Sequence, residues 1–146
     1  LKHKNTRIVL NIMTQKDCLF CRVQGPDYKD EIVYQSKYFF VTRDSYPVTE
    51  YHTLIILKRC APSFFHLTGE EVNDFYHTLK EQECVIKKLD NTVSAFNIGI
   101  NDGKDAGQSI PHLHIHLIPR RNGDMDNPQG GVRGVIPEKQ KYVRRK

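Results

Sequence analysis

Apolar and polar positions along the chain follow two periods, which predict strands before and after one long helix. Short runs rich in β-branched and aromatic residues, bounded by polar turns, are typical of strands. Only Ser36 and Lys37 separate the first two runs, which predicts a hairpin, and the third run is continuously apolar, as in a buried strand. The predicted strands are residues 32–35, 38–43, 52–58, 94–100 and the segment that follows residue 108 and ends at Pro119.

The strongest helical signal covers residues 69–90. Thr68 and Glu71 have the spacing of a capping box, in which the hydroxyl and the carboxylate each satisfy a free backbone N–H. Beyond them, apolar residues recur at the three- and four-residue spacing of one helix face. This expected apolar stripe consists of Val72, Phe75, Tyr76, Leu79, Ile86 and Leu89.

Successive strands around a single long helix favour an α+β fold with an antiparallel sheet. The length of 146 residues suits one domain, and no internal repeat or linker divides it. We expect the core in residues 17–124. Residues 1–16 are expected to form a loosely ordered arm, and residues 125–146, rich in Gly, Pro and charge, a loosely ordered tail.

The charge pattern suggests an anionic ligand, since the net charge is +5. The basic end KYVRRK is either a solvated terminus or a nucleic-acid contact, and the lack of interleaved aromatic residues weakens the second interpretation. No apolar run approaches the roughly 18 residues of a membrane span, and we recognise no signal peptide. We therefore expect a cytoplasmic protein that does not contact a membrane.

Three of the seven histidines fall within five residues, in the segment SIPHLHIHLIP. Side chains alternate between the two faces of a strand, so these histidines share one face and the apolar residues between them pack toward the helix. The histidines are His112, His114 and His116, and the residues between and after them are Leu113, Ile115 and Leu117.

Three interpretations of this segment compete. It is a polar strand face, a metal site in which two of the histidines share an ion, or a site where an imidazole attacks an anionic substrate. The third is favoured because Gln108 and Ser109 supply donors just before the strand. In addition, Gly99, Gly103 and Gly107 allow backbone amides to approach a phosphate closely.

The segment HLHIHLI resembles the signature of the histidine-triad (HIT) superfamily of nucleotide hydrolases and transferases. The likeness extends to NDGKDAGQSIPHLHIHLIPRRNGD, to RDSYPVTEYHTLIILKR and to KDCLFC, which resembles bacterial zinc-containing members, and it covers about residues 17–124. IPRR followed by Gly123-Asp124, in a chain without Trp, resembles the dinucleoside polyphosphate hydrolases (fragile-histidine-triad-like) more than the nucleoside phosphoramidases. The resemblance implies an antiparallel sheet of about five strands, the long helix, and a short N-terminal helix.

The resemblance also implies a covalent mechanism on a purine nucleotide. His114 would attack the α-phosphorus, with its other ring nitrogen held by a backbone carbonyl, and water would then release a mononucleotide. His116 and His52 would hold phosphate oxygens, while Gln108 and Ser109 would orient the leaving group. His52 has an alternative role as a buried structural histidine.

Further residues would hold the nucleotide. Asp44 matches a ribose-hydroxyl acceptor, although without the family it is equally an ordinary turn residue. Three residues match the apolar positions around the base, although alone they would be core residues, and two lie in the loop before the histidines. These are Leu19, Phe20 and Val23 around the base, and Asn101 and Gly107 in the loop.

Cys18 and Cys21 form a C-x-x-C pair, which by itself indicates a redox motif, half of a zinc site, or chance. The resemblance implies that His112 and a histidine after the 52–58 strand complete a structural zinc site. The chain has Cys60 at the second of these positions, and three cysteines with one histidine are a common zinc set. We expect Cys84 to be a small buried side chain of the helix.

Tyr51 departs from the family, many members of which have Gly before the equivalent of His52. Tyr at this position is either strained at positive φ or adopts an extended conformation. The resemblance further implies a homodimer. The alternatives are a phosphoramidase or dinucleotide phosphorylase of the same superfamily, or a zinc-stabilised nucleotide-binding module without catalysis, which would not need His114.

Overall fold

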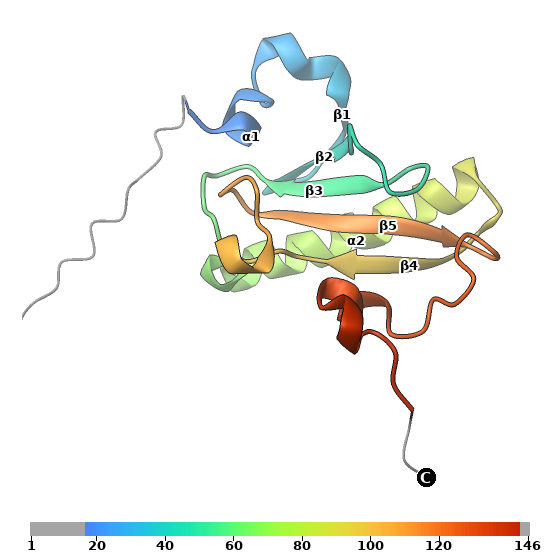
Figure 1. The fold of residues 1–146 in the computed structure, drawn as a ribbon. Helices are drawn as coiled ribbons and strands as arrows, with labels where there is room; N and C mark the ends of the chain where they lie inside the picture. Colours follow the sequence, from blue (N-terminus) through green and yellow to red (C-terminus); the bar gives the residue numbers. More distant parts are fainter. Residues whose placement is uncertain (1–16, 144–146) are drawn as a thin grey trace, which may run out of the picture.

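The computed structural model describes residues 17–143. A five-stranded antiparallel sheet has the order β1-β2-β3-β5-β4 (Figure 1), which confirms the predicted α+β class. The expectations for residues 1–16 and for the last basic residues lie outside the described part of the chain. The elements are α1 (Leu19–Arg22), β1 (Ile32–Gln35), β2 (Phe39–Arg43), β3 (Thr53–Leu57), α2 (Gly69–Leu89), β4 (Val93–Gly99) and β5 (His114–Arg121).

Helix α2 begins at the predicted capping box. The Thr68 hydroxyl accepts from the Glu71 N–H at 3.2 Å, and the Glu71 carboxylate accepts from the Thr68 N–H at 2.8 Å. The predicted apolar stripe is only partly right, because half of it is exposed and the buried face includes polar residues. Phe75, Leu79 and Ile86 pack inward with Glu71, Thr78 and Gln82, whereas Val72, Tyr76, Leu89 and also Cys84 are exposed.

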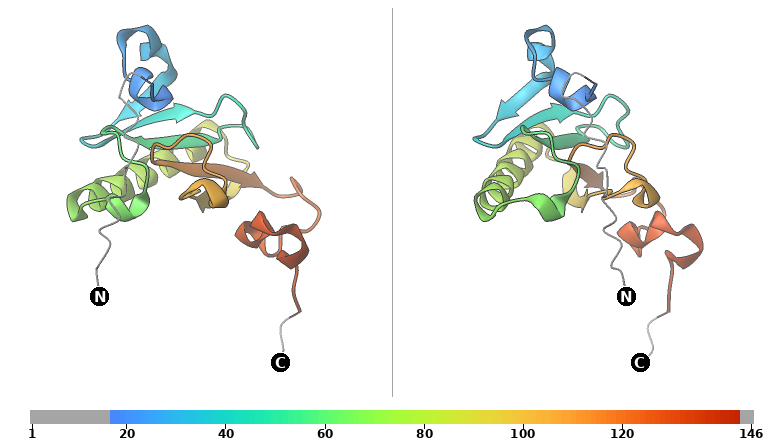
Figure 2. Two further views of the ribbon diagram at one scale, coloured as in Figure 1. Left: turned by 60° about the vertical axis from the view of Figure 1, so that its left-hand side comes forward. Right: turned by 90° about the vertical axis from the view of Figure 1, so that its left-hand side faces the viewer.

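The two faces of the sheet carry separate apolar clusters. Phe39, Val41 and Ile55 pack with Leu113 and Ile115 against α2, as the alternation predicted. On the opposite face, Phe40, Leu54 and Ile56 pack with the N-terminal residues Cys18, Phe20 and Val23. Figure 2 shows α2 and the C-terminal segment on opposite sides of the sheet. The alternation therefore directs the histidines of β5 to the face that α2 does not cover.

Strand β5 continues through Pro119, which corrects the expectation that this residue ends it. Pro119 pairs with Phe96 of β4, and its carbonyl oxygen accepts from the Thr49 hydroxyl at 2.6 Å on the other side. In an antiparallel strand the N–H and C=O of one residue point the same way. The N–H that proline lacks is thus on the side away from β4, where the ladder to β3 has already stopped at Leu117.

Residues 125–143 follow a defined path rather than forming the expected loose tail. They contain two 3₁₀ helices, η4 (Gly131–Val135) and η5 (Pro137–Lys139), and η4 lies beside β4 (Figure 1). Gly131 packs so closely on Asn97 of β4 that a Cβ atom there would lie 3.2 Å from the Asn97 amide nitrogen. Within residues 17–143, no helix is long and apolar enough to cross a membrane.

Candidate active site and metal centre

His114, the first residue of β5, is buried and held by a backbone carbonyl. Its Nδ1 lies 2.8 Å from the carbonyl oxygen of His112. Because a carbonyl oxygen can only accept, Nδ1 carries the ring proton and Nε2 keeps its lone pair in the neutral ring. The ring of Phe20 packs edge-on against it, with ring centroids 5.1 Å apart. His114 therefore has the tautomer that a nucleophilic Nε2 requires.

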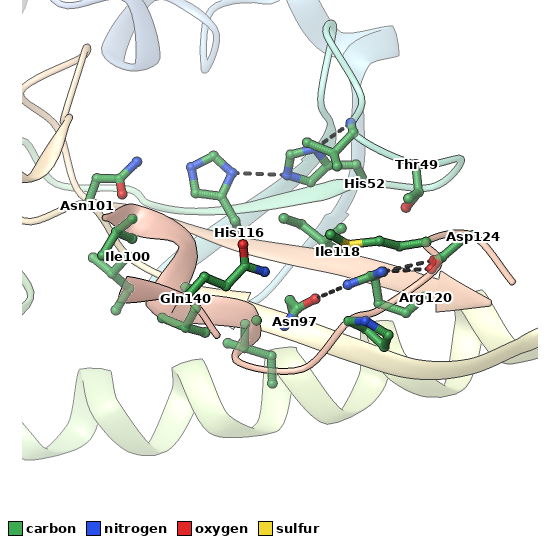
Figure 3. A pocket seen from close by; sticks show the side chains of 18 residues that line it. Thr49, His52, Asn97, Ile100, Asn101, His116, Ile118, Arg120, Asp124 and Gln140 are labelled. Carbon is green, nitrogen blue, oxygen red and sulfur yellow. Dashed lines mark hydrogen bonds and ion pairs between the residues drawn. The ribbon is translucent and has the colours of Figure 1, made fainter. Parts of the chain in front are cut away.

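His52 and His116 form a hydrogen-bonded pair beside this ring (Figure 3). The Val48 N–H donates to His52 Nδ1 at 3.2 Å, so the proton of neutral His52 lies on Nε2. That Nε2 is 3.0 Å from Nδ1 of His116, to which it donates. His116 then carries its own proton on Nε2, where it is available to an anionic oxygen.

Burial keeps this pair uncharged at neutral pH. Burial lowers the pKa of His116 to about 4, and the neighbouring His114 and His52 rings act in the same direction. Burial also lowers the pKa of His52, against the opposing effect of Asp44. The uncharged pair forms a chain of hydrogen bonds from the Val48 N–H through His52 to His116. The remaining N–H of His116 is able to donate to an anionic oxygen.

Asp44 lies beside His52, directly after β2. One carboxylate oxygen accepts from the Tyr46 N–H at 2.8 Å, as in an ordinary Asx turn, and the other lies 3.6 Å from His52 Nδ1. Tyr51, directly before His52, has φ of 64° and is the one non-glycine residue with positive φ among residues 17–143. The extended alternative for Tyr51 was therefore wrong, and the backbone that presents His52 is strained.

A cavity of about 590 Å³ opens beside His116. Its floor is formed by β4 and β5, and its far wall by residues of the C-terminal segment (Figure 3). Of the predicted site residues, His52, His116 and Asn101 line it, whereas His114 lies behind His116 with ring centroids 5.2 Å apart. The hydrogen-bonded pair of His52 and His116 therefore lies between the cavity and the buried ring of His114.

Several predicted residues have other contacts. Gln108 donates to the Pro62 carbonyl at 2.7 Å and accepts from the Gly103 N–H at 2.9 Å, so its amide braces the loop. Gly107 has φ of 89° and ends the short turn of that loop, and Ser109 is exposed. Around the predicted base site, Phe20 and Val23 are buried in the apolar cluster beside β2 and β3, while Leu19 is partly exposed.

Sequence reasoning missed the polar residues at the other end of the cavity. Arg120 donates to the side-chain amide oxygen of Asn97 at 2.7 Å. It also makes two hydrogen bonds to the Asp124 carboxylate, at 2.8 and 2.7 Å. These bonds hold the start of the C-terminal segment on the sheet. The alternation that placed His114 and His116 on one face continues to Arg120, and it is a signal that could have found this residue.

The second cluster joins Cys18, Cys21, Cys60 and His112, the four predicted metal ligands. Their sulfur and nitrogen atoms all lie within 4.8 Å of one another. His112 donates from Nε2 to the Leu57 carbonyl at 2.6 Å, which leaves the Nδ1 lone pair 3.2 Å from Cys18 Sγ and 3.6 Å from Cys21 Sγ. Three sulfurs and an oriented imidazole fit the donor set of tetrahedral zinc.

The pKa of Cys21 reflects the crowding of these sulfurs. Burial and the neighbouring Cys18 and Cys60 raise the pKa of this thiol to about 12. Thiols that resist ionisation on their own become thiolates when they bind a metal, because the cation supplies the missing positive charge. A cation bound in this cluster would therefore favour the thiolate of Cys21.

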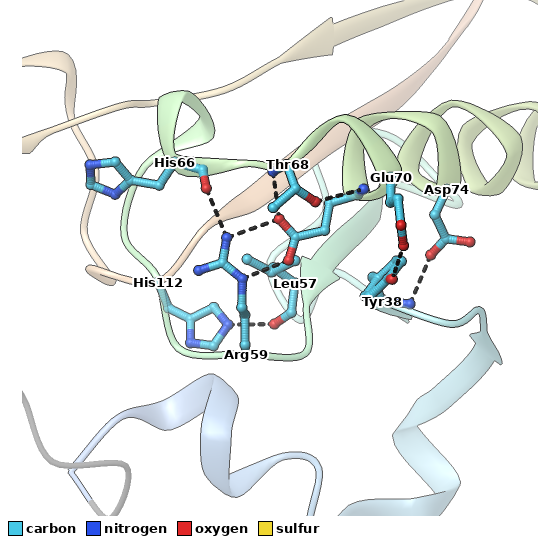
Figure 4. A network of polar contacts seen from close by, with 9 residues as sticks. Tyr38, Leu57, Arg59, His66, Thr68, Glu70, Asp74 and His112 are labelled. Atoms are coloured by element: carbon cyan, nitrogen blue, oxygen red, sulfur yellow. Dashed lines mark hydrogen bonds and ion pairs between the residues drawn. The ribbon is translucent and has the colours of Figure 1, made fainter.

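A polar network attaches the metal cluster to α2 (Figure 4). Arg59, next to Cys60, makes two bonds to the Glu71 carboxylate, at 2.6 and 2.9 Å, and a third to the His66 carbonyl at 2.8 Å. The guanidinium and the Thr68 N–H lower the pKa of Glu71 to about 2, against the effect of burial. The helix cap therefore also fixes the loop that carries one of the four ligands.

Comparisons with known proteins show which family this chain resembles. The HIT domain family model matches residues 26–123. The chain is 41% identical over 65% of its length to a nitrilase and fragile histidine triad fusion protein of Caenorhabditis elegans, and 37% identical over 64% to a bis(5'-nucleosyl)-tetraphosphatase (asymmetrical) of Schizosaccharomyces pombe. It spans only 21% and 51% of these two relatives. The solved structure of a Zn-bound histidine triad family protein from Mycobacterium smegmatis matches with a TM-score of 0.68 and 31% identity, covering 75% of this chain and 79% of that one.

Proposed function

The chain belongs to the HIT domain family, and on that premise we propose that it hydrolyses dinucleoside polyphosphates through a covalent intermediate on His114. The observation that carries the proposal is the 2.8 Å bond from His114 Nδ1 to the His112 carbonyl, which leaves Nε2 unprotonated. A nucleotide-binding module without catalysis would have no need of a ring held in this tautomer. The similarity to a bis(5'-nucleosyl)-tetraphosphatase supports the substrate class.

The reaction proceeds in two displacements at the α-phosphorus. The Nε2 lone pair of His114 forms a P–N bond while the P–O bond to the remaining phosphates breaks, and the departing oxygen keeps the electron pair. Water then attacks the same phosphorus, the P–N bond breaks, and a mononucleotide and a proton are released. His116 donates from Nε2 to the phosphate oxygens, and His52 holds the other nitrogen of that ring at 3.0 Å.

Cys18, Cys21, Cys60 and His112 would hold a structural zinc ion. With four protein ligands a tetrahedral ion would have no open position, so it would stabilise the fold without contacting the substrate. The Zn-bound relative supports this assignment. We further propose a homodimer that acts in the cytoplasm. The open hydrogen-bonding edge of β4 and the free cysteines of the described residues support these two points.

The proposal is tested by intact-protein mass spectrometry after brief exposure to diadenosine triphosphate, diadenosine tetraphosphate or adenosine phosphoramidate. We expect a transient mass increase of one adenylyl group on the wild type, none on His114→Ala, and faster release of AMP from a dinucleotide than from the phosphoramidate. Preference for the phosphoramidate would favour the phosphoramidase alternative. Incorporation of added phosphate into the product would favour a phosphorylase, and binding without turnover a sensor.

A further inference from the structure

The cavity beside His116 extends over β4, away from α1 (Figure 3). One end is formed by His52, His116 and Asn101, so a ligand inside it reaches the proposed phosphate contacts. Among the described residues that line it, none belongs to α1. Phe20 of α1 instead packs against the ring of His114, which does not line the cavity. Two separate regions thus flank the row of histidines.

The walls of this cavity are mostly apolar. Its volume of about 590 Å³ lies inside the range of roughly 300–1,000 Å³ that is usual for small-molecule sites. Side chains from the sheet and from the C-terminal segment face each other across it, as two walls would enclose a flat ring. These residues are Ile98, Ile100 and Ile118 from the sheet side, and Met125, Val132 and Val135 from the C-terminal segment.

Two amides supply the cavity with unused hydrogen-bonding capacity. The side-chain amide of Gln140 is directed toward His116 (Figure 3) and makes no hydrogen bond within residues 17–143. Asn97 uses its oxygen to accept from Arg120, which leaves its two N–H donors. Primary amides on an apolar wall pair well with the ring nitrogens and exocyclic groups of a nucleobase.

The charges of the cavity point to a neutral occupant. Its only charged lining residues in the described chain, Arg120 and Asp124, neutralise each other through two hydrogen bonds. The histidines at the other end are uncharged donors suited to phosphate. The end of the cavity at His116 therefore suits phosphate, and the remainder is an uncharged, mostly apolar pocket with amide groups.

The sequence of the C-terminal segment is built to form this wall. Gly130, with φ of 85°, lies so close to the Gln140 backbone that a Cβ atom would come within 2.1 Å of its carbonyl oxygen. At Gly134 a Cβ atom would lie 3.2 Å from the Gln140 side-chain amide. Glycine at both positions lets the segment fold around Gln140 and fixes where its amide points.

We propose that this cavity is the subsite for the second nucleoside of a dinucleoside polyphosphate, the one that leaves with the remaining phosphates. The inference rests on the proposed function. The family resemblance implies that the nucleotide retained on His114 is held by residues of α1 and by Asp44, and neither α1 nor Asp44 lines the cavity. The base of the leaving nucleoside lies between the apolar walls, with its polar edge on the amides of Gln140 and Asn97.

Two substrates that yield the same adenylyl-His114 test this assignment. Diadenosine triphosphate has a second nucleoside, and adenosine phosphoramidate has none. We expect Gln140→Ala and Val135→Asp to lower kcat/KM for diadenosine triphosphate by about tenfold, the usual effect of one lost contact in such a pocket, and to change the phosphoramidate value less than about twofold. Val135 is 75% exposed, so the charge is not expected to unfold the chain. Val143→Asp, at a position 94% exposed and outside the cavity, is the matched control.

Loss on diadenosine triphosphate alone would support the subsite assignment. Equal losses on both substrates would assign the cavity to the retained nucleotide and overturn the inference, as would no loss on either. Gly130→Ala, which displaces the segment without removing a lining side chain, should reproduce the selective loss. A wild type that turns over neither substrate would refute the proposed function. In that case an unchanged Kd of the variants for diadenosine triphosphate would overturn the subsite too.

Discussion

His112 and His114 lie two residues apart in one segment, yet their rings carry the proton on opposite nitrogens. His112 donates from Nε2 to the Leu57 carbonyl and presents Nδ1 to the sulfurs of the metal cluster. His114 donates from Nδ1 to the His112 carbonyl and keeps the Nε2 lone pair. The residue type is the same, so the backbone carbonyl that each ring meets decides its chemistry.

We expect this difference to assign a structural role to His112 and a chemical role to His114. His112 precedes β5, where its ring is free to turn toward Leu57, whereas His114 is the first residue in the ladder. The carbonyl that holds His114 belongs to the backbone of His112. Substitution of a cysteine in the cluster leaves this backbone carbonyl in place. We therefore expect substitutions in the cluster and substitutions of His114 to have separable effects.

The largest expected effect is on kcat, when His114 is replaced. We expect His114→Ala to lower kcat for diadenosine triphosphate by at least about 10⁴-fold, because the intermediate cannot form. His116→Ala should lose about 10²–10³-fold, as one donor to the phosphate oxygens is removed. Single-turnover kinetics measure both. Comparable losses in the two variants would mean that His114 acts only as another donor.

The next effect concerns stability and leaves the chemistry in place. Cys60→Ala should lose most of its bound zinc and about 4 kcal/mol of stability, or roughly 10 °C in Tm, while still forming the adduct on His114 at low temperature. Zinc content by mass spectrometry and Tm by calorimetry measure this. Cys84→Ala is the control, because Cys84 is exposed and outside the cluster. Equal behaviour of the two variants would remove Cys60 from the metal site.

A smaller effect tests how the metal loop is attached to α2. Arg59→Leu leaves the buried Glu71 carboxylate without its two charge-assisted bonds. We expect a loss of about 1–3 kcal/mol, limited by the partial exposure of Arg59. Denaturant unfolding of the variant measures it, with Lys37→Leu, which removes a fully exposed ion pair, as the control. An Arg59→Leu variant as stable as the wild type would show that the helix cap alone fixes this loop.

A further effect is the pH dependence that the histidine pair adds to the free energy of unfolding. The folded-state pKa of His116 is about 4, below the ordinary 6.5, so the unfolded chain binds more protons between these values. Acidification from pH 6.5 to 4 should therefore reduce the free energy of unfolding. His116→Gln should weaken that dependence, in unfolding curves at pH 7 and 5. The lowered pKa values of Asp90, Asp124 and Glu71, each about 2, act at lower pH.

The sheet and the face on which His114 and His116 lie were predictable because their signals are local. Alternation along β5 directs His114 and His116 to one face, and the capping box at Thr68 and Glu71 depends on residues three apart. The C-x-x-C spacing of Cys18 and Cys21 is also local, but the prediction that Cys60 and His112 join them depended on the family resemblance. Here the structure agrees with it in bringing the four ligands together.

The remaining features depend on contacts between distant segments. In the sequence, the glycines of the C-terminal segment suggest a loose tail. In the structure, Gly130 and Gly134 pack against Gln140, and Gly131 packs against Asn97 of β4. Likewise, α2 buries Gln82 because Arg43 of β2 donates to its side chain at 3.4 Å, so hydrophobicity alone misjudged that face. Composition and periodicity do not contain such pairings.

The most direct test of the opposite proton positions is ¹⁵N NMR of the histidine rings in the zinc-loaded protein at neutral pH. We expect His114 to carry its proton on Nδ1 and to have an unprotonated Nε2, while His112 carries its proton on Nε2. His114→Ala and His116→Ala spectra provide the assignments. A proton on Nε2 of His114, or one tautomer shared by both rings, would contradict the claim that backbone carbonyls divide the roles of these histidines.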